Sequence, residues 1–518
     1  MLAESSSNSR IAKNTLLLYL RMFLLMLIGL YTSRVILNAL GVVDYGTYNV
    51  VGGFVSMFAL VSSSLTSAIS RFLTFELGKN EYSEKLSHIF SSSVTIQIFL
   101  VIVVIILAET AGVWFLNNKM SIPPERSYAA NWVFQWSVFT FCINLLNVPY
   151  NSAIIAHEKM SAFAYIGIVE ALFKLGIAFL IMFSPIDKLI FYAILMALVS
   201  LSITFMYMMY AIRHFSECSF HFIIDKRIIK RMFGFAGWTF LGNTAYILMT
   251  QGVSILMNIF FGVIVNAARG IAMIIDNILT QFVTNFTMAM NPPIIKSYSR
   301  ENLEYMHKLI CAGSKYSFFL LYALALPILL ETNAILALWL KTVPDYTVIF
   351  VRLTLLNTLV IVVSNTLITG ILATGKIRNY QLIIGSFSLF ALPLIYIGYR
   401  LGFKPSFAYF TTIFIYIMQF SVRIYYLRKV LSLSICFYFK HVICPIFFTG
   451  LISLIPSLTL YKIMSAHSLW SGFSVIIISE LFVLFAIYFV GISTVERKML
   501  KTKCQFFLGK LKHDSNIR

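Results

Sequence analysis

The feature that most constrains the fold is a series of long apolar segments that recurs along most of the chain. A helix needs about 20 predominantly apolar residues to cross the hydrocarbon core of a bilayer. Of the 518 residues, 59% are hydrophobic and 12% are charged, whereas soluble domains carry about 25% charged residues. The pattern predicts an all-α polytopic membrane protein.

We identify fourteen candidate transmembrane segments. They cover approximately 14–37, 47–70, 89–111, 131–150, 161–184, 188–210, 234–260, 266–290, 311–337, 347–372, 380–400, 406–428, 440–461 and 469–492. Each boundary can shift by several residues, because Gly, Pro, Ser or Asn interrupts several segments. The loops between them are too short to fold into a catalytic domain.

The net charge of +20 does not indicate a nucleic-acid partner, because Lys and Arg occur in short runs between the apolar segments. An even number of spans places both termini on one side, and most of the Lys and Arg outside the spans fall on that side. The positive-inside rule therefore predicts that both termini are cytoplasmic. Two basic amphipathic stretches, 222–233 and 496–512, are expected to contact anionic membrane lipids at this surface.

A weak internal repeat divides the chain. Residues 33–48 align with 254–270, so that Asn38 matches Asn258 and Gly41 matches Gly262. The offset of about 220 residues covers six spans, which predicts a parallel repeat of two lobes with the site between them.

The repeat gives five expected regions, namely an N-lobe (1–218, spans 1–6), a linker helix (219–233), a C-lobe (234–430, spans 7–12), two further spans (431–495) and a basic tail (496–518). The expected fold is two pseudo-symmetric six-helix lobes followed by two C-terminal helices.

Charged residues inside the spans are the candidate functional residues, because a charge in hydrocarbon is costly and usually faces protein or water. Arg21 and Arg34 lie on span 1, about 20 Å apart along the axis and about 140° apart around it, so they cannot hold one anion together. Glu170 and Lys174 are four residues apart and can form a pair on one helix face.

Further charged candidates lie in later spans. Arg269 begins span 8, and Asp276 lies two turns further on the same face, where it could pair with Arg269. Arg352 lies in span 10 and Glu480 in span 14. No Walker A sequence, HExxH motif or paired cysteines are present, so we expect no ATP hydrolysis, no metal site and no cofactor.

The stretch Ser33–Val51 carries a family resemblance in Arg34, Leu40-Gly41 and Tyr45-Gly46-Thr47-Tyr48. It resembles the first-helix signature of bacterial polysaccharide exporters. Length, span number and repeat also resemble the multidrug/oligosaccharidyl-lipid/polysaccharide (MOP) superfamily, which includes the multidrug transporters called MATE. The most similar members are its lipid-linked oligosaccharide flippases of the O-antigen type.

The resemblance implies a non-enzymatic transporter in the bacterial inner membrane. Such proteins move an undecaprenyl-diphosphate-linked oligosaccharide between leaflets by alternating access, and cavity arginines hold the diphosphate. It also implies a glycan polymerase and a chain-length regulator as partners. The expected diphosphate-binding residues are Arg34, Arg21, Lys174, Arg352 and Arg269, and the expected ion-coupling residues are Glu170, Asp276 and Glu480.

Two other functions remain open from the sequence. A cation-coupled multidrug exporter of the same superfamily should carry acidic residues on span 1, but this span has two arginines and no acid. A membrane-embedded glycosyltransferase, polymerase or ligase should have a large outer loop or a catalytic acid pair, and neither is visible.

Overall fold

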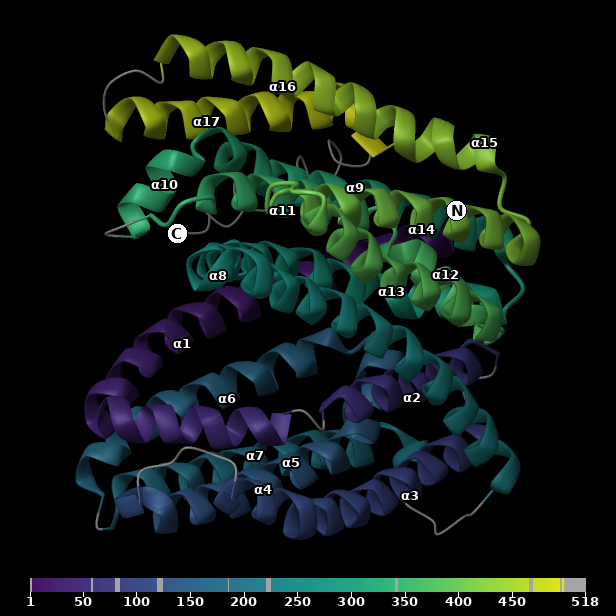
Figure 1. Cartoon of the computed structure of the whole chain (residues 1–518). Helices are drawn as coiled ribbons and strands as arrows, with labels where there is room; N and C mark the ends of the chain where they lie inside the picture. Colours follow the sequence, from purple (N-terminus) through teal and green to yellow (C-terminus); the bar gives the residue numbers. More distant parts are fainter. Residues whose placement is uncertain are drawn as a thin grey trace, which may run out of the picture. The chain divides into compact units, whose positions relative to one another are not determined.

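The structure is a computed structural model, and it describes residues 2–56, 59–79, 84–118, 124–184, 186–219, 225–340, 343–464, 469–493 and 496–497. Within these ranges all regular elements are helices, which confirms the all-α fold class (Figure 1). The chain forms two compact units. Unit 1 contains Met1–Tyr246, Met288–Met306 and Thr369–Ser386, and unit 2 contains Ile247–Thr287, His307–Ile368 and Phe387–Arg518.

The helices of the N-terminal half are long and mostly apolar. They are α1 (Leu2–Ser56), α2 (Ala59–Lys79), α3 (Glu84–Leu107), α4 (Val113–Asn118), α5 (Ser127–Ala156), α6 (Met160–Leu180), α7 (Lys188–His214) and α8 (Lys226–Ser299). In unit 1, α5 packs against α7, α2 and α3, and α1 packs along α6.

The later helices are α9 (Leu303–Leu330), α10 (Thr332–Trp339), α11 (Thr347–Val362), α12 (Asn365–Thr374), α13 (Arg378–Arg400), α14 (Phe407–Leu431), α15 (Ile435–Tyr438), α16 (Cys444–Met464) and α17 (Leu469–Ala486). Within unit 2, α11 packs against α14, and α16 and α17 lie side by side.

Eleven helical segments in the described ranges are long and apolar enough to cross a membrane. Each overlaps one of the fourteen predicted spans. The other three predicted spans, 14–37, 47–70 and 266–290, lie in the helices α1, α2 and α8. The chain is therefore a multi-pass membrane protein, while the count of fourteen remains a prediction.

The two glycines that the repeat aligned have the same unusual backbone conformation. Gly41 in α1 has φ 79° and ψ 169°, and Gly262 in α8 has φ 80° and ψ −174°. This region of φ/ψ space is essentially restricted to glycine. Each glycine therefore turns the chain sharply between two helical arms.

An ion triad anchors the helical arm of α1 that follows Gly41. The Arg126 guanidinium donates to the carboxylates of Asp44, on α1, and Asp187. The distance to Asp187 is 2.6 Å, and Asp187 also accepts from the backbone N–H groups that begin α7. The helical arm of α1 that follows Gly41 is thus tied to two other parts of unit 1.

The predicted interfacial helix over 222–233 is not a separate element where the structure describes it. Asp225 caps a helix that starts at Lys226 and continues without a break to Gly262. The N–H groups of Ile228 and Arg227 donate to the Asp225 carboxylate and lower its pKa. Residues 222–224, and nearly all of the predicted amphipathic tail 496–512, lie outside the described residues.

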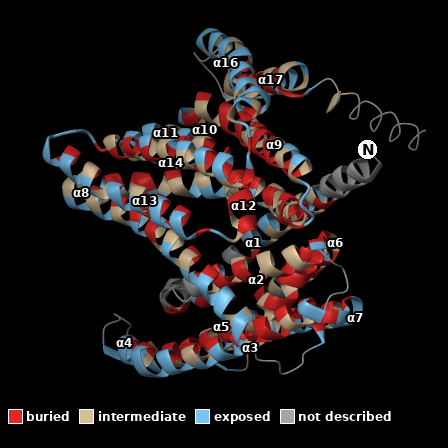
Figure 2. Cartoon of the chain, turned by 90° about the vertical axis from the view of Figure 1, so that its right-hand side faces the viewer, coloured by how far each residue is buried: buried red, intermediate tan, exposed pale blue. Residues whose placement is uncertain are grey.

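Large apolar side chains are exposed on many helices, as expected for surfaces that face lipid. Figure 2 shows exposed residues along α4 and α16. On α16, Phe447 is 61% exposed and Phe448 is 51% exposed.

Candidate functional site in the membrane-spanning helices

Arg21 lies on α1 and packs against α6. Its guanidinium carbon is 4.2 Å from the centre of the Phe163 ring, an arrangement that stabilises a cation. A Cβ atom at Gly167 would lie 2.1 Å from Arg21 Nε, so only glycine leaves space for this side chain. Arg21 Nε is buried and has no hydrogen-bond partner among the described residues.

Glu170 and Lys174 form the pair that their spacing predicts. The Lys174 ammonium donates to the Glu170 carboxylate at 2.6 Å. The Lys174 side chain is 40% exposed and that of Glu170 is 29% exposed, so both remain accessible from outside the packed helices.

Arg21 and the pair share one face of α6. Phe163, Gly167, Glu170 and Lys174 recur at intervals of four, three and four residues, which places them along one stripe of a helix. Tyr207 of α7 interacts electrostatically with both Arg21 and Glu170. The structure therefore brings three predicted site residues into one cluster, which we call the α6 cluster (Arg21, Glu170 and Lys174).

The backbone of Arg34 lies in α1, but its side chain falls outside the described residues. The predicted role of Arg34 therefore stays a prediction. Tyr31, three residues before it, contacts Phe179 of α6 with ring centres 6.4 Å apart, so α1 follows α6 beyond Arg21.

Arg269 belongs to unit 2 and joins the two arms of α8. Its Nε donates to Ser254 Oγ at 2.9 Å, and its Nη2 donates to the Thr250 carbonyl at 3.1 Å. The guanidinium also lies 5.7 Å from the Tyr409 ring. Because Arg269 is only 8% exposed, these contacts give it a role in bracing the turn at Gly262.

Asp276 is held by Thr358 of α11, whose hydroxyl donates to its carboxylate. Among the described residues neither Asp276 nor Arg269 pairs with the other, so the predicted Arg269–Asp276 pair is wrong. The reason is that Arg269 bonds across the Gly262 turn to the other arm of α8, and Asp276 bonds to Thr358 of α11, so both have closer partners than each other.

Arg352 and Glu480 lie in different settings. Arg352 donates to the Leu329 carbonyl at 3.1 Å and to Thr332 Oγ at 3.2 Å, so it caps the end of α9. It also borders a cavity of about 600 Å³ beside residues 343–349. Glu480 is half-buried on α17 and pairs with no other described residue.

A second set of contacts in unit 1, which sequence reasoning missed, joins distant segments. Lys296 pairs with the buried Glu158 at 2.9 Å, and Asn14 donates to the Glu158 carbonyl. The other contacts are Arg300 Nε to the Gly78 carbonyl at 2.8 Å and Arg71 Nη2 to the Ala373 carbonyl at 2.9 Å. We call these contacts the clasp.

A sequence model described as "Polysaccharide biosynthesis protein" matches residues 11–289, more than half of the chain. The chain belongs to this family. A search among curated proteins finds no match. The resemblance that the Arg34–Tyr48 motif indicated is therefore confirmed at the level of the family.

Solved structures of similar fold are MOP-superfamily transporters. A crystal structure of a MATE point mutant has a TM-score of 0.72 at 12% identity and covers 83% of this chain and 97% of its own. A MOP transporter from Pyrococcus furiosus has a TM-score of 0.68 at 13% identity, covering 82% and 96%. The MATE transporter ClbM with Rb⁺ has a TM-score of 0.67 at 16% identity, covering 83% and 96%. At these identities the comparison shows that this chain has the MOP fold.

Proposed function

We propose that the protein is a flippase that moves a polyprenyl-diphosphate-linked oligosaccharide across the bacterial inner membrane. The cargo is the repeat unit of an O-antigen, capsule or exopolysaccharide. Membership of the polysaccharide biosynthesis family and the MOP fold support a membrane transporter of glycan precursors.

The observation that carries the proposal is the setting of Arg21. A guanidinium inside a span costs roughly 2.5–3.5 kcal/mol on insertion scales unless it is compensated. Arg21 is stabilised by an aromatic ring and keeps a buried Nε without a partner in the described chain. A guanidinium binds phosphate oxygens through paired, charge-assisted hydrogen bonds. The Nη groups of Arg21 are not among the buried atoms and bond to no described residue, so they are the atoms through which Arg21 would hold an anionic ligand.

Lys174 supplies the second positive charge of the α6 cluster. Without cargo, Glu170 neutralises Lys174. When a diphosphate enters, the Lys174 ammonium turns to it, and Glu170 becomes free to take up a proton. In this scheme Glu170 links cargo binding to proton movement, with Asp276 and Glu480 as the other coupling candidates. The further candidates for binding the diphosphate along its path are Arg34, Arg269 and Arg352.

In alternating access, the contacts of the clasp keep one end of unit 1 closed until cargo enters. The positive-inside rule places Asn14, Glu158 and Lys296 toward the cytoplasm, with both termini. Entry of cargo from that side requires the contacts of Lys296 and Arg300 to separate.

The test is surface glycan export by cells in which the gene is deleted and then restored as a variant. Arg21→Gln and Lys174→Gln should each reduce surface glycan about tenfold or more, and lipid-linked precursor should accumulate. Lys188→Gln is the matched control, because Lys188 is an exposed cation at the start of α7 in the same unit. Full export by both Arg21→Gln and Lys174→Gln at normal membrane levels would contradict the proposal.

A cation-coupled multidrug exporter is the second candidate, and the half-buried Asp276 carboxylate favours it. In that case deletion would sensitise cells to cationic drugs and leave surface glycan unchanged. Asp276→Asn would reproduce the drug sensitivity, whereas Arg21→Gln would not.

A further inference from the structure

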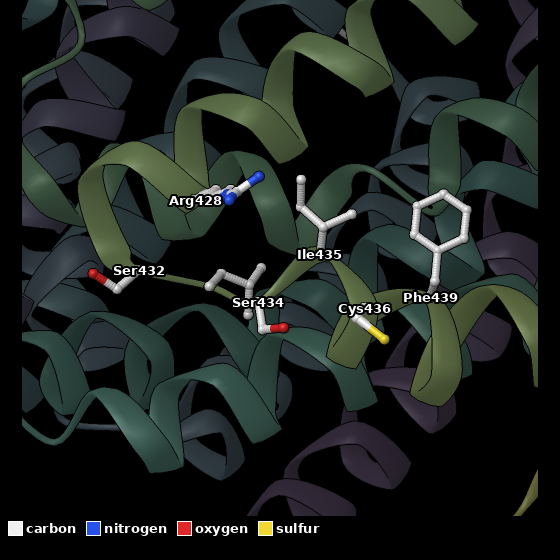
Figure 3. Close-up of a pocket in the computed structure, with 7 residues that line it drawn as sticks. Arg428, Ser432, Ser434, Ile435, Cys436 and Phe439 are labelled. Atoms are coloured by element: carbon white, nitrogen blue, oxygen red, sulfur yellow. The ribbon is translucent and has the colours of Figure 1, made fainter.

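A cavity of about 890 Å³ lies where α14 ends and the next helical segment begins. Its lining is formed by Arg428, Ser432, Leu433, Ser434, Ile435, Cys436 and Phe439. The volume falls within the range of small-molecule sites, roughly 300–1,000 Å³. Figure 3 shows the Arg428 side chain extending from the end of α14 toward Ile435, with Phe439 on the far side.

The cavity is cationic, because Arg428 forms no ion pair or hydrogen bond with another described residue. Along the chain, no Asp or Glu stands between Asp345 and Glu480. Lys440 adds positive charge one residue beyond the lining residue Phe439. The local charge therefore favours an anion.

Two serines, Ser432 and Ser434, line the cavity beside Arg428. Ser432 has φ 55°, a left-handed conformation that ends α14 and reverses the chain. Ser434 accepts from the Phe437 N–H at 3.3 Å, so its own O–H is free to donate. The Arg428 guanidinium and the Ser434 hydroxyl can both donate to the oxygen atoms of a phosphate group.

The other wall of the cavity is apolar and leads onto a surface expected to face lipid. Phe439 is 44% exposed. Along the same continuous helical segment, Ile435–Met464 is a candidate membrane span, and Phe447 and Phe448 are exposed on it. A ligand that fits both walls has an anionic head and a hydrocarbon chain.

We propose that this cavity binds the phosphate headgroup of an anionic phospholipid of the cytoplasmic leaflet, with its acyl chains along α16. Basic pockets beside transmembrane helices on the cytoplasmic side recognise such headgroups. The assignment to the cytoplasmic leaflet follows from the orientation given by the positive-inside rule. Headgroup binding itself does not depend on transport of any cargo.

The test is lipid retention by the full-length protein, measured by native mass spectrometry after incubation with phosphatidylglycerol or phosphatidylcholine. Arg428→Gln should lower phosphatidylglycerol retention about tenfold, as expected for loss of a charge-assisted hydrogen bond. Lys429→Gln is the matched control, because Lys429 is exposed, adjacent and outside the cavity lining. It should retain lipid as the unchanged protein does.

Three results would overturn the proposal. They are equal retention of both lipids, equal losses in Arg428→Gln and Lys429→Gln, and full displacement of phosphatidylglycerol by millimolar inorganic phosphate, which would identify a free-phosphate site. A thermal unfolding curve confirms that each variant is folded. Because no transport is measured, failure here leaves the proposed flippase function intact, and failure of export leaves this site intact.

Discussion

At the scale of single residues, the charges within the spans fall into two kinds. Arg269 and Arg352 have their guanidinium groups bonded to carbonyl and hydroxyl oxygens of unit 2. Arg21 rests on Phe163 and retains an unpartnered Nε among the described residues. Of these three arginines, Arg21 therefore fits an anion-binding role best.

The fit of Arg21 against Gly167 can be tested without removing a charge. Gly167→Ala places a methyl group 2.1 Å from Arg21 Nε, so the guanidinium must move away from the Phe163 ring. We expect surface glycan to fall about tenfold with normal protein levels. Gly176→Ala is the matched control on α6, because its Cβ would meet no atom within 4 Å. Equal export by both variants would show that the position of Arg21 is unimportant.

A second prediction at this scale concerns stability. The buried Lys315 on α9 pairs with Glu496 at 3.0 Å, and Glu496 also accepts from the Ser493 N–H. Burial alone would raise the pKa of Glu496, but Lys315 and Ser493 lower it overall. Glu496→Gln should cost about 1–3 kcal/mol of stability, measured as a lower unfolding temperature in detergent.

The pH dependence of this pair has a definite sign. Because the pKa of Glu496 is lowered in the folded protein, its contribution is present at neutral pH. It should be lost as pH falls below about 4.3, the ordinary value for Glu. The unfolding temperatures of the unchanged protein and of Glu496→Gln should therefore converge at acidic pH. A constant difference between them would contradict the assignment.

At the scale of elements, the sequence repeat locates two matching turns. The alignment paired Gly41 with Gly262 from a few identities, and both glycines have the same glycine-only conformation. Helical periodicity also predicted the Glu170–Lys174 pair, because both residues lie on one helix. It failed for Asp276, whose partner Thr358 comes from another helix. Spacing along one helix shows which residues share a face but not which helix packs against it.

Replacing either glycine at these turns should lower the free energy of unfolding. Gly41→Ala and Gly262→Ala should each destabilise the protein by about 1–3 kcal/mol, because alanine cannot readily adopt this conformation. The controls are Gly29→Ala in α1 and Gly270→Ala in α8, both with open space around the added methyl group. The two turn variants should unfold at lower temperatures than the two controls. Equal unfolding temperatures would show that the turns tolerate a side chain.

At the scale of the whole molecule, hydropathy predicted a helical multi-pass protein, because the bilayer permits few spanning structures. The MOP fold was implied by the resemblance of the Arg34–Tyr48 motif. The sequence could not predict the clasp, since its partners are far apart along the chain and the contacts of Arg300 and Arg71 are to backbone carbonyls, which carry no sequence pattern. The predicted lobe boundaries at 218 and 234 remain untested. The two compact units do not follow them, because 288–306 and 369–386 belong to unit 1.

The clasp should open during transport. A Cβ at Gly78 would lie 3.0 Å from the Ser299 Cβ and 2.9 Å from the Lys296 Cα, so the two segments must separate slightly to reach the spacing of roughly 3.5–4.5 Å in disulfides. In a background without the native cysteines, Gly78→Cys with Ser299→Cys should cross-link on oxidation and stop export. Reduction should restore export, and each single variant is a control. Continued export by the fully cross-linked protein would show that these segments need not separate.

The most direct test of the central claim is flipping by the purified protein in proteoliposomes. The substrate is a polyprenyl-diphosphate oligosaccharide, and the readout is its exposure to a lectin or glycosidase outside the vesicle. We predict that the unchanged protein and Lys188→Gln accelerate the appearance of glycan outside, and that Arg21→Gln does so about tenfold more slowly. No acceleration by folded, unchanged protein, or equal rates for all three proteins, would contradict the account.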